Sequence, residues 1–192
     1  MRIRTRSTAA LAVAGLGLST VAALGLASPA SAAGPTCRGV AATIVGTAGA
    51  DELEGTSGRD VIVGLAGGDE IDGNGGDDLI CAGSGDDEID GGRGSDTIWG
   101  QAGRDEIDGG SGSDRIRAGQ GHDDVDGDTG ADRIWGDAGN DDLAGGRGDD
   151  RITGGTGRDL LEGERGTDRL TGGAGQDRVF QGSEPDRDND DD

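Results

Sequence analysis

Aspartates that recur every nine residues are the side chains of this sequence with the clearest chemistry. The fifteen that share this spacing are Asp51, Asp60, Asp69, Asp78, Asp87, Asp96, Asp105, Asp114, Asp123, Asp132, Asp141, Asp150, Asp159, Asp168 and Asp177. If the intervening segments stack as parallel strands, equivalent side chains on one side lie about 4.8 Å apart. A carboxylate ladder at that spacing is strongly unfavourable unless positive charge lies between its rungs. Carboxylate and carbonyl oxygens in flexible loops suit Ca²⁺ better than zinc or copper, so the spacing predicts a row of calcium sites.

The residues between the aspartates supply the elements that would position them. From Gly46 to Phe180 the sequence divides into fifteen nine-residue units without insertion or deletion, with Gly at position four and Asp at position six of every unit. The glycines allow positive φ and tight turns that bring carbonyl groups inward. Position eight is always Leu, Ile or Val, which predicts a three-residue strand with one inward side chain. Stacked units then share a continuous aliphatic column, as in other solenoids.

Two well-formed units are Gly91-Gly92-Arg93-Gly94-Ser95-Asp96-Thr97-Ile98-Trp99 and Gly145-Gly146-Arg147-Gly148-Asp149-Asp150-Arg151-Ile152-Thr153. The pattern resembles the G-G-x-G-x-D-x-U-x nonapeptide of RTX (repeats-in-toxin) proteins, and the resemblance extends over residues 46–180. It implies an all-β fold, a right-handed parallel β-roll (a solenoid) with two repeats per coil. It also implies that each Ca²⁺ lies between loops n and n+2, held by the position-six aspartates and backbone carbonyls. Fifteen loops paired in this way give at most thirteen complete sites.

The sequence departs from the family pattern at two positions of the unit. Position two is Gly in only seven units, and the other eight carry Thr47, Thr56, Leu65, Asn74, Gln101, Asp128, Asp137 and Glu164. Position five, often Asn or Asp in the family, is Arg at Arg59, Arg104 and Arg158. We expect loops with these replacements to bind calcium more weakly.

The composition argues against a conventional packed core. The chain has 43 Gly, 39 acidic residues, no Tyr and one Phe, and 31% of its residues are hydrophobic. Such a chain cannot bury enough apolar surface to offset the entropy of ordering, so its fold has to rely on repetition and on a cation that neutralises its acids. The net charge of −22 argues against nucleic acid and anionic membranes as partners.

The first 32 residues have the features of a signal peptide. Three arginines precede an almost wholly apolar run from Ala9 to Leu26, and Ala30-Ser31-Ala32 forms an A-x-A cleavage signature. We expect cleavage after Ala32 and a secreted, extracellular protein. Cleavage removes three Arg and no acids, so the mature charge becomes −25, which thirteen Ca²⁺ would nearly neutralise. The expected organisation is a signal peptide over 1–32, a cap segment over 33–45, the β-roll over 46–180 and an acidic, disordered tail over 181–192.

Odd and even units differ at positions seven and nine, which point outward. Odd units carry acids there, beginning with Glu52 and Glu54, whereas even units change from apolar residues such as Val61 and Val63 to arginines toward the C-terminus. The true repeat is therefore eighteen residues, which supports two units per coil. One face of the roll should be an acidic ladder and the other should run from apolar to basic.

The basic end of the even face is a candidate partner face. It is made of Trp99, Arg115, Arg117, Arg133, Trp135, Arg151 and Arg169. Trp99, Arg117 and Trp135 occupy position nine of consecutive even units and are expected to form a Trp–Arg–Trp stack. This face could bind an acidic partner, a glycan or another copy of the chain, and packing among its own side chains is the simpler alternative.

Cys37 and Cys81 are the only cysteines of the chain. A signal peptide sends both to an oxidising compartment, which favours a disulfide over a metal site made of two thiolates. Thr43-Ile44-Val45 falls in phase with the repeats, with Ala42 where the aspartate would be. We expect this segment to form a metal-free capping strand, which a Cys37–Cys81 bond would hold over the apolar end of the even face.

No arrangement of residues indicates an enzyme. His122 is the sole histidine and lies at the variable position five of a loop, and no nucleophile motif is present. An ice-binding surface would need a longer threonine ladder than Thr153 and Thr171 provide. Two functions stay open: a secreted protein whose purpose is calcium binding, and a structural or adhesive protein of the cell envelope that calcium stabilises.

Overall fold

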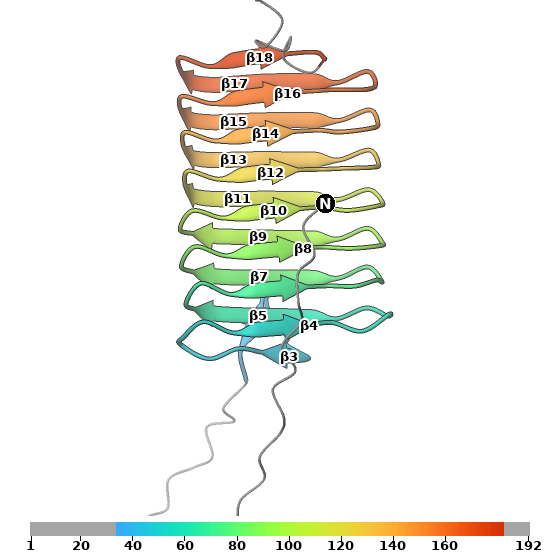
Figure 1. The fold of residues 1–192 in the computed structure, drawn as a ribbon, viewed down its shortest axis with the longest axis vertical. Coiled ribbons are helices and arrows are strands. Elements are labelled where there is room, and N and C mark those ends of the chain that lie inside the picture. The colour runs from blue at the N-terminus through green and yellow to red at the C-terminus, as the bar shows by residue number, and fades with distance from the viewer. Residues whose placement is uncertain (1–33, 183–192) are drawn as a thin grey trace, which may run out of the picture. The chain divides into compact units, whose positions relative to one another are not determined.

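Residues 34–182, the part of the chain that the computed structural model describes, form a stack of parallel β-strands without any helix (Figure 1). The predicted signal peptide and nearly all of the predicted tail lie outside these residues. Within residues 34–182 there is consequently no helix long and apolar enough to cross a membrane.

The strands belong to two eight-stranded sheets and one hairpin. The long-strand sheet contains β3 (Ile44–Val45), β5 (Val61–Ala66), β7 (Leu79–Ser84), β9 (Thr97–Ala102), β11 (Arg115–Gly121), β13 (Arg133–Gly139), β15 (Arg151–Gly157) and β17 (Arg169–Gly175). The short-strand sheet contains β4 (Glu52–Glu54), β6 (Glu70–Asp72), β8 (Glu88–Asp90), β10 (Glu106–Asp108), β12 (Asp124–Asp126), β14 (Asp142–Ala144), β16 (Leu160–Glu162) and β18 (Arg178–Phe180). The hairpin joins β1 (Thr36–Cys37) to β2 (Val40–Ala41).

The register of both sheets is eighteen residues, as in the pairs Ile116↔Ile134 and Ile107↔Val125. Each coil therefore contains two nine-residue units, one in each sheet, and the predicted parallel solenoid with an eighteen-residue repeat is confirmed. The expected three-residue strands occur only in the short-strand sheet. In the other sheet β5 to β17 have six or seven residues, because the first residues of each following loop remain in the parallel ladder.

The core is a double column of aliphatic side chains between the two sheets. Position eight of each unit points inward, and from Leu53 to Leu161 these side chains are at most 9% exposed. Strands of the short-strand sheet accordingly alternate between exposed, buried and exposed side chains. One inward residue per strand is enough because every coil adds to the same column.

The invariant glycine at position four is required by the distance between successive loops. Gly112 has φ +146°, and a Cβ on it would lie 1.6 Å from the carbonyl oxygen of Gly94 in the preceding coil. The same loops are linked by backbone bonds, since the N–H of Gly94 donates to the carbonyl of Ser111 at 2.8 Å. A side chain at position four would therefore separate the coils.

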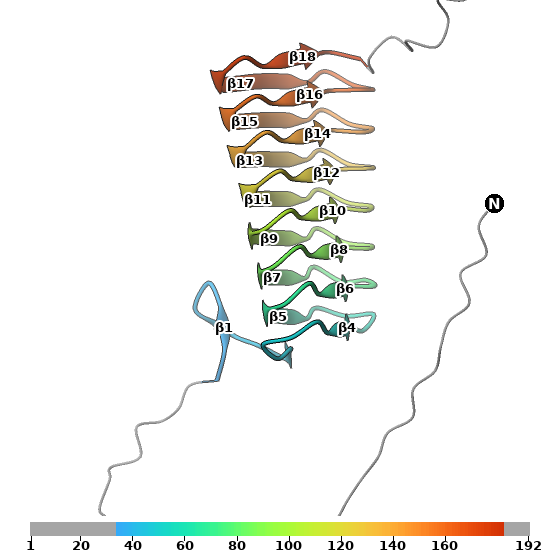
Figure 2. The ribbon, with the colours of Figure 1, turned by 60° about the vertical axis from the view of Figure 1, so that its left-hand side comes forward.

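A hairpin cap covers the N-terminal end of the long-strand sheet. Arg38 and Gly39 both have positive φ and form the two-residue turn between β1 and β2. β1 lies against β5 and β7 (Figure 2), and the predicted disulfide between Cys37 and Cys81 is present. Cys37 and Cys81 are buried in an apolar cluster with Val61, Val63 and Leu79. The cap thus shields the apolar part of this sheet from water.

The capping strand predicted from its phase is also present. Ile44 and Val45 pair with Ile62 and Val63 as β3. The Thr43 hydroxyl accepts a hydrogen bond from the N–H of Val61 at 2.9 Å and lies within hydrogen-bond distance of Asp60 Oδ1. The roll therefore begins with a rung that has a threonine hydroxyl and Ala42 in place of a carboxylate.

Breaking the disulfide should loosen the cap before the rest of the roll. Closing a loop between residues 44 positions apart stabilises a fold by on the order of 3–4 kcal/mol in the loop-entropy model. We expect Cys81→Ser to speed hydrogen exchange in residues 36–45 at saturating calcium while β11 to β17 keep their protection. Cys37→Ser is the matched control and should give the same pattern. Unchanged exchange in the cap of both variants would show that the apolar cluster alone holds it.

Candidate metal centre

The position-six aspartates form two buried ladders, one along each line of loops. From Asp69 to Asp159 their exposed fraction is at most 2%. The backbone N–H of each donates to Oδ1 of the aspartate eighteen residues later, from Asp51 to Asp69 (2.9 Å) through Asp159 to Asp177 (3.2 Å). One oxygen of each carboxylate thus links two coils. The aspartates that the spacing singled out are brought together in this way.

The other oxygen of most ladder carboxylates has no partner in the protein. Oδ2 is buried and accepts no hydrogen bond in Asp69, Asp78, Asp87, Asp96, Asp105, Asp114, Asp123, Asp132, Asp141, Asp150, Asp159 and Asp168. An unpaired buried carboxylate oxygen is costly, and native proteins satisfy nearly all such atoms. The same unpaired oxygen recurs in twelve successive loops, so it is the atom that a bound cation could satisfy.

Backbone carbonyls lie beside these unpaired oxygens. The point where a Cβ on Gly64 would stand is 2.5 Å from Asp69 Oδ2 and 2.4 Å from the carbonyl oxygen of Ala82 in the next coil. At Gly154 the corresponding distances are 2.4 Å to Asp159 Oδ2 and 2.5 Å to the carbonyl oxygen of Gly172. Two oxygens from successive coils therefore converge where position one lacks a side chain.

This donor set fits a hard cation. Calcium takes carboxylate and carbonyl oxygens at 2.3–2.6 Å in flexible geometry. Within residues 34–182 no group of three or more His, Cys, Asp or Glu side chains could hold a metal by itself. The residues present thus fit calcium bound by a mixed set of carboxylates and carbonyls, as the resemblance implied.

Burial raises the pKa of the interior ladder carboxyls, those at nine-residue intervals from Asp78 to Asp159. The pKa reaches about 7 in Asp105 and Asp114, where loss of hydration outweighs the N–H bond from the preceding aspartate and the neighbouring carboxylates add to the rise. It reaches about 6 in Asp87, Asp96, Asp132 and Asp141 for the same reasons. A ladder without cations is therefore partly protonated near neutral pH.

The first two rungs differ from the rest. Asp51 Oδ2 accepts bonds from the N–H (2.6 Å) and hydroxyl (2.9 Å) of Thr47, and Asp60 Oδ2 accepts the same pair from Thr56 at 2.7 and 2.8 Å. The Thr56 N–H lowers the pKa of Asp60 against the effect of burial. Sequence reasoning missed this feature, although threonine occupies position two only in these two units.

Position-five side chains lie along the outer edges of the loops and bond the next coil. Asp86 Oδ1 accepts the N–H of Arg104 at 2.8 Å, and Asn140 Oδ1 accepts the N–H of Arg158 at 2.8 Å. Exposed His122 does the same through Nδ1, which accepts the N–H of Asn140 at 2.9 Å. This contact gives the histidine a structural role, whereas weaker calcium binding at the arginine loops stays a prediction.

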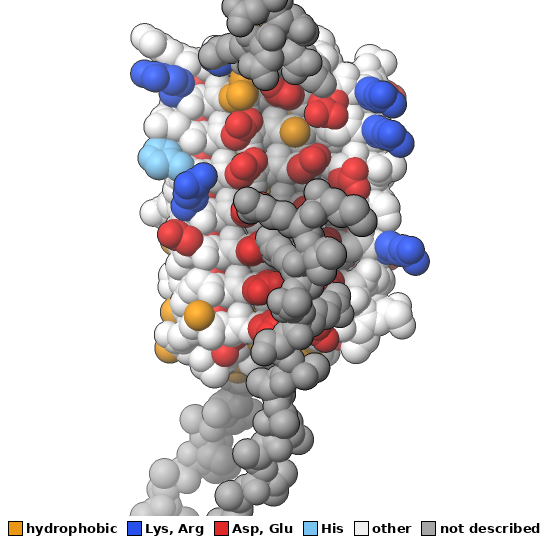
Figure 3. All heavy atoms as spheres, in the orientation of Figure 1, with side chains coloured by type: hydrophobic (Ala, Val, Ile, Leu, Met, Phe, Trp, Pro, Cys, Tyr) orange, Lys and Arg blue, Asp and Glu red, His pale blue; other side chains and the backbone are white. Residues whose placement is uncertain are grey.

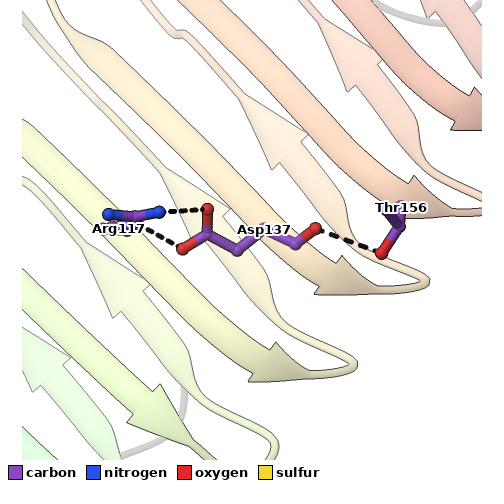
Figure 4. A network of polar contacts seen from close by, with 3 residues as sticks. All are labelled: Arg117, Asp137 and Thr156. Carbon is purple, nitrogen blue, oxygen red and sulfur yellow. Dashed lines mark hydrogen bonds and ion pairs between the residues drawn. The ribbon is translucent and has the colours of Figure 1, made fainter.

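Along the candidate partner face, the arginines align but the expected Trp–Arg–Trp stack is wrong. Arg117 is in register with Trp99 and Trp135, yet its guanidinium forms a two-point ion pair with Asp137 (Figure 4), in which Nη2 and Oδ1 are 2.9 Å apart. Trp99 is instead covered by Arg38 of the cap, 5.3 Å from its ring centroid. Arg117 thus pairs with the carboxylate of Asp137, at position two in the next coil, and does not stack on the tryptophan rings.

Position seven forms two opposite columns on the two sheets. Arg115, Arg133, Arg151 and Arg169 are neighbours in the long-strand sheet. Glu52, Glu70, Glu88, Glu106, Asp124 and Asp142 are neighbours in the short-strand sheet. Figure 3 shows acidic side chains in columns on the face toward the viewer. The two predicted faces are thus present, one acidic and one basic.

Comparison with known proteins agrees with this site. The family model of the RTX calcium-binding nonapeptide repeat, four copies long, matches residues 45–80, 54–89, 82–116, 117–152 and 144–179. These matches together extend over most of the chain. No curated protein matches it.

The raised pKa values predict that the calcium-free roll becomes less stable as the pH rises. Between about pH 4 and pH 7 the folded ladder binds more protons than the unfolded chain, so the free energy of unfolding should fall as pH rises through this range. Circular dichroism in calcium-depleted buffer should show more β-structure at pH 5 than at pH 8. With saturating calcium the trend should reverse, because protons compete for the same oxygens. Greater β-structure at pH 8 in depleted buffer would contradict the proton-filled ladder.

Proposed function

Because the chain belongs to the family of RTX calcium-binding nonapeptide repeats, we propose that it is a secreted protein whose roll folds when calcium binds between stacked loops outside the cell. The observation that carries the proposal is the series of twelve buried Oδ2 atoms without a hydrogen-bond donor. Each lies in the same place in successive coils. Bound calcium supplies positive charge between the rungs, which the polypeptide does not provide.

The individual residues have separate tasks in this proposal. Asp69 to Asp168, at nine-residue intervals, bond the preceding coil through Oδ1 and offer Oδ2 to the ion. Carbonyls at position one of the following coil, such as that of Ala82, complete the donor set. The aliphatic column then supplies apolar burial along the whole stack, to which the cluster under the cap adds at one end. Catalysis has no part in the proposal, because the carboxylates are committed to the ladder.

Calcium should convert an expanded chain into a compact, β-rich one. The mature charge of −25 opposes stacking until ions reduce it, and binding to the folded state alone couples ligation to folding. Circular dichroism and small-angle scattering at pH 7.5 should show this change between chelator and about 1 mM Ca²⁺, the range of extracellular calcium modules. A compact, β-rich protein in chelator, or an equal response to Mg²⁺, would contradict the proposal.

Asp105→Asn provides the matched test of the ladder. Asparagine can still accept the N–H of Asp87 but replaces the unpaired oxygen and the charge. We expect the calcium midpoint to rise about tenfold, equivalent to ~1.4 kcal/mol. Asp51→Asn is the control at the end of the stack, where Thr47 occupies the second oxygen, and should change the midpoint little.

A second candidate function, assembly outside the cell, is favoured by one further observation. No hydrogen bond or ion pair joins the guanidinium groups of Arg115, Arg133, Arg151 and Arg169 to any residue within 34–182. Adjacent like charges in one column are unfavourable unless a partner neutralises them. The acidic column of the short-strand sheet has the same strand spacing, so we propose another copy of the chain as the partner. Such contacts are heterologous and open-ended.

Light scattering of the calcium-loaded protein at low salt should detect this assembly. We expect association that weakens above about 0.15 M salt, where exposed charges are screened, and that is lost in the Arg133→Glu, Arg151→Glu variant. Arg93→Glu, Arg147→Glu changes the net charge equally at exposed loop positions and should still associate. A monomer at every salt concentration, or equal behaviour of both variants, would remove this candidate.

A further inference from the structure

In the first two rungs of the aspartate ladder, Asp51 and Asp60, Oδ2 accepts hydrogen bonds, whereas in the later rungs it has no donor. We propose that Thr47 and Thr56 close these rungs to calcium, so that the cap and the first coil fold without an ion and the calcium sites begin at Asp69. The inference rests on the proposed function for its calcium sites. It adds that the N-terminal end of the roll folds independently of calcium.

The hydrogen bonds of Asp51 and Asp60 carry the first step. In both residues Oδ2 accepts two donors from one threonine, a backbone N–H and a hydroxyl, at 2.6–2.9 Å. In Asp69, Asp78 and the following rungs the same atom is buried without a donor. Oδ2 of Asp51 and of Asp60 therefore already accepts two hydrogen bonds. A cation beside either oxygen would also be repelled by the partial positive charge on the N–H and O–H groups that point toward it. The first two rungs are thus complete without metal.

The backbone at position two explains why only these two rungs are closed. In units three to fifteen this residue always has positive φ, whether it is glycine or a larger residue such as Leu65 (φ 86°) or Gln101 (φ 82°). Thr47 and Thr56 are absent from this conformation, which β-branched residues avoid. Elsewhere the position-two N–H is turned away from the ladder, as in Asn74, Gly110 and Asp128, where it donates to the aspartate two residues earlier.

The cap supplies the rest of a calcium-independent unit. Thr43 extends the hydrogen bonding to Asp60, and the disulfide ties the cap to β7. The apolar cluster around Val61, Val63 and Leu79 is the only part of the outer surface of the long-strand sheet that is buried in this way within residues 34–182. Hydrogen bonds, a covalent link and apolar burial therefore coincide at one end of the stack.

The number of ions follows from this assignment. Thirteen pairs of aspartates eighteen residues apart are joined by N–H to Oδ1 bonds, from Asp51–Asp69 to Asp159–Asp177. Closing the pairs that start at Asp51 and Asp60 leaves eleven. The upper limit of thirteen that counting loops provides is therefore lowered by two.

The test combines calcium stoichiometry with hydrogen exchange. Equilibrium dialysis with elemental analysis of the mature protein at saturating calcium should give at most eleven ions per chain, and up to two more for Thr47→Gly, Thr56→Gly. Asn74→Gly, Gln101→Gly is the matched control, since it makes the same kind of change at position two of later units, and should not gain ions. Thr47→Ser, Thr56→Ser keeps the hydroxyls and should behave as the wild type.

Exchange in chelator tests the folding part without any ion. We expect residues 36–66 of the wild type to exchange at least about tenfold more slowly than β9 to β17, and the glycine variant to lose this difference. Thirteen ions on the wild type, or uniform exchange along its chain in chelator, would overturn the closure of the first rungs. A wild type that binds no calcium at all would instead overturn the proposed function.

Discussion

Burial of carboxylates in a repeating ladder is the interaction on which the rest of this structure depends. In each interior aspartate one carboxylate oxygen accepts the backbone N–H of the aspartate in the preceding coil, and the other oxygen has no donor. The hydrogen bond to the first oxygen fixes the distance between coils. The second oxygen is buried without a donor, and no group of the polypeptide offsets the free energy that this costs. Because each strand adds only one side chain to the aliphatic column, the apolar burial is too small to offset the cost of burying the carboxylates.

The other regularities of the sequence follow from the same ladder. Position four must be glycine because a Cβ there would clash with the carbonyl of the preceding coil, as at Gly112. Position one is nearly always glycine because the space that its side chain would fill is where two oxygens from successive coils converge, as at Gly64. Ala82 and Ala118 are the two exceptions, and both methyl groups are completely buried in the core.

Most of the fold could be predicted from the sequence because a strict period leaves little freedom. The period gave the parallel stack and the two faces, and the phase of Ile44-Val45 gave the capping strand. Contacts made by side chains at the variable positions of the unit were harder to predict. Arg117 pairs with Asp137 rather than with the tryptophans beside it. Asp137 lies in the next coil, at position two of the unit after Trp135, and the direction of its side chain depends on a positive φ. The bonds from Thr47 and Thr56 depend on the backbone conformation at the same position.

The eighteen-residue register also constrains how the length of such a chain can change. Removing one nine-residue unit would keep glycine and aspartate in phase, so the ladder itself would be preserved. Every strand beyond the deletion, however, would move to the opposite sheet. Deletion of the unit Gly100–Asp108 would therefore place the arginine column in line with the glutamates of β4 to β8. Gain or loss of whole coils leaves both faces intact, whereas gain or loss of half a coil mixes them. Duplication in this gene is thus compatible with the two faces only in steps of eighteen codons.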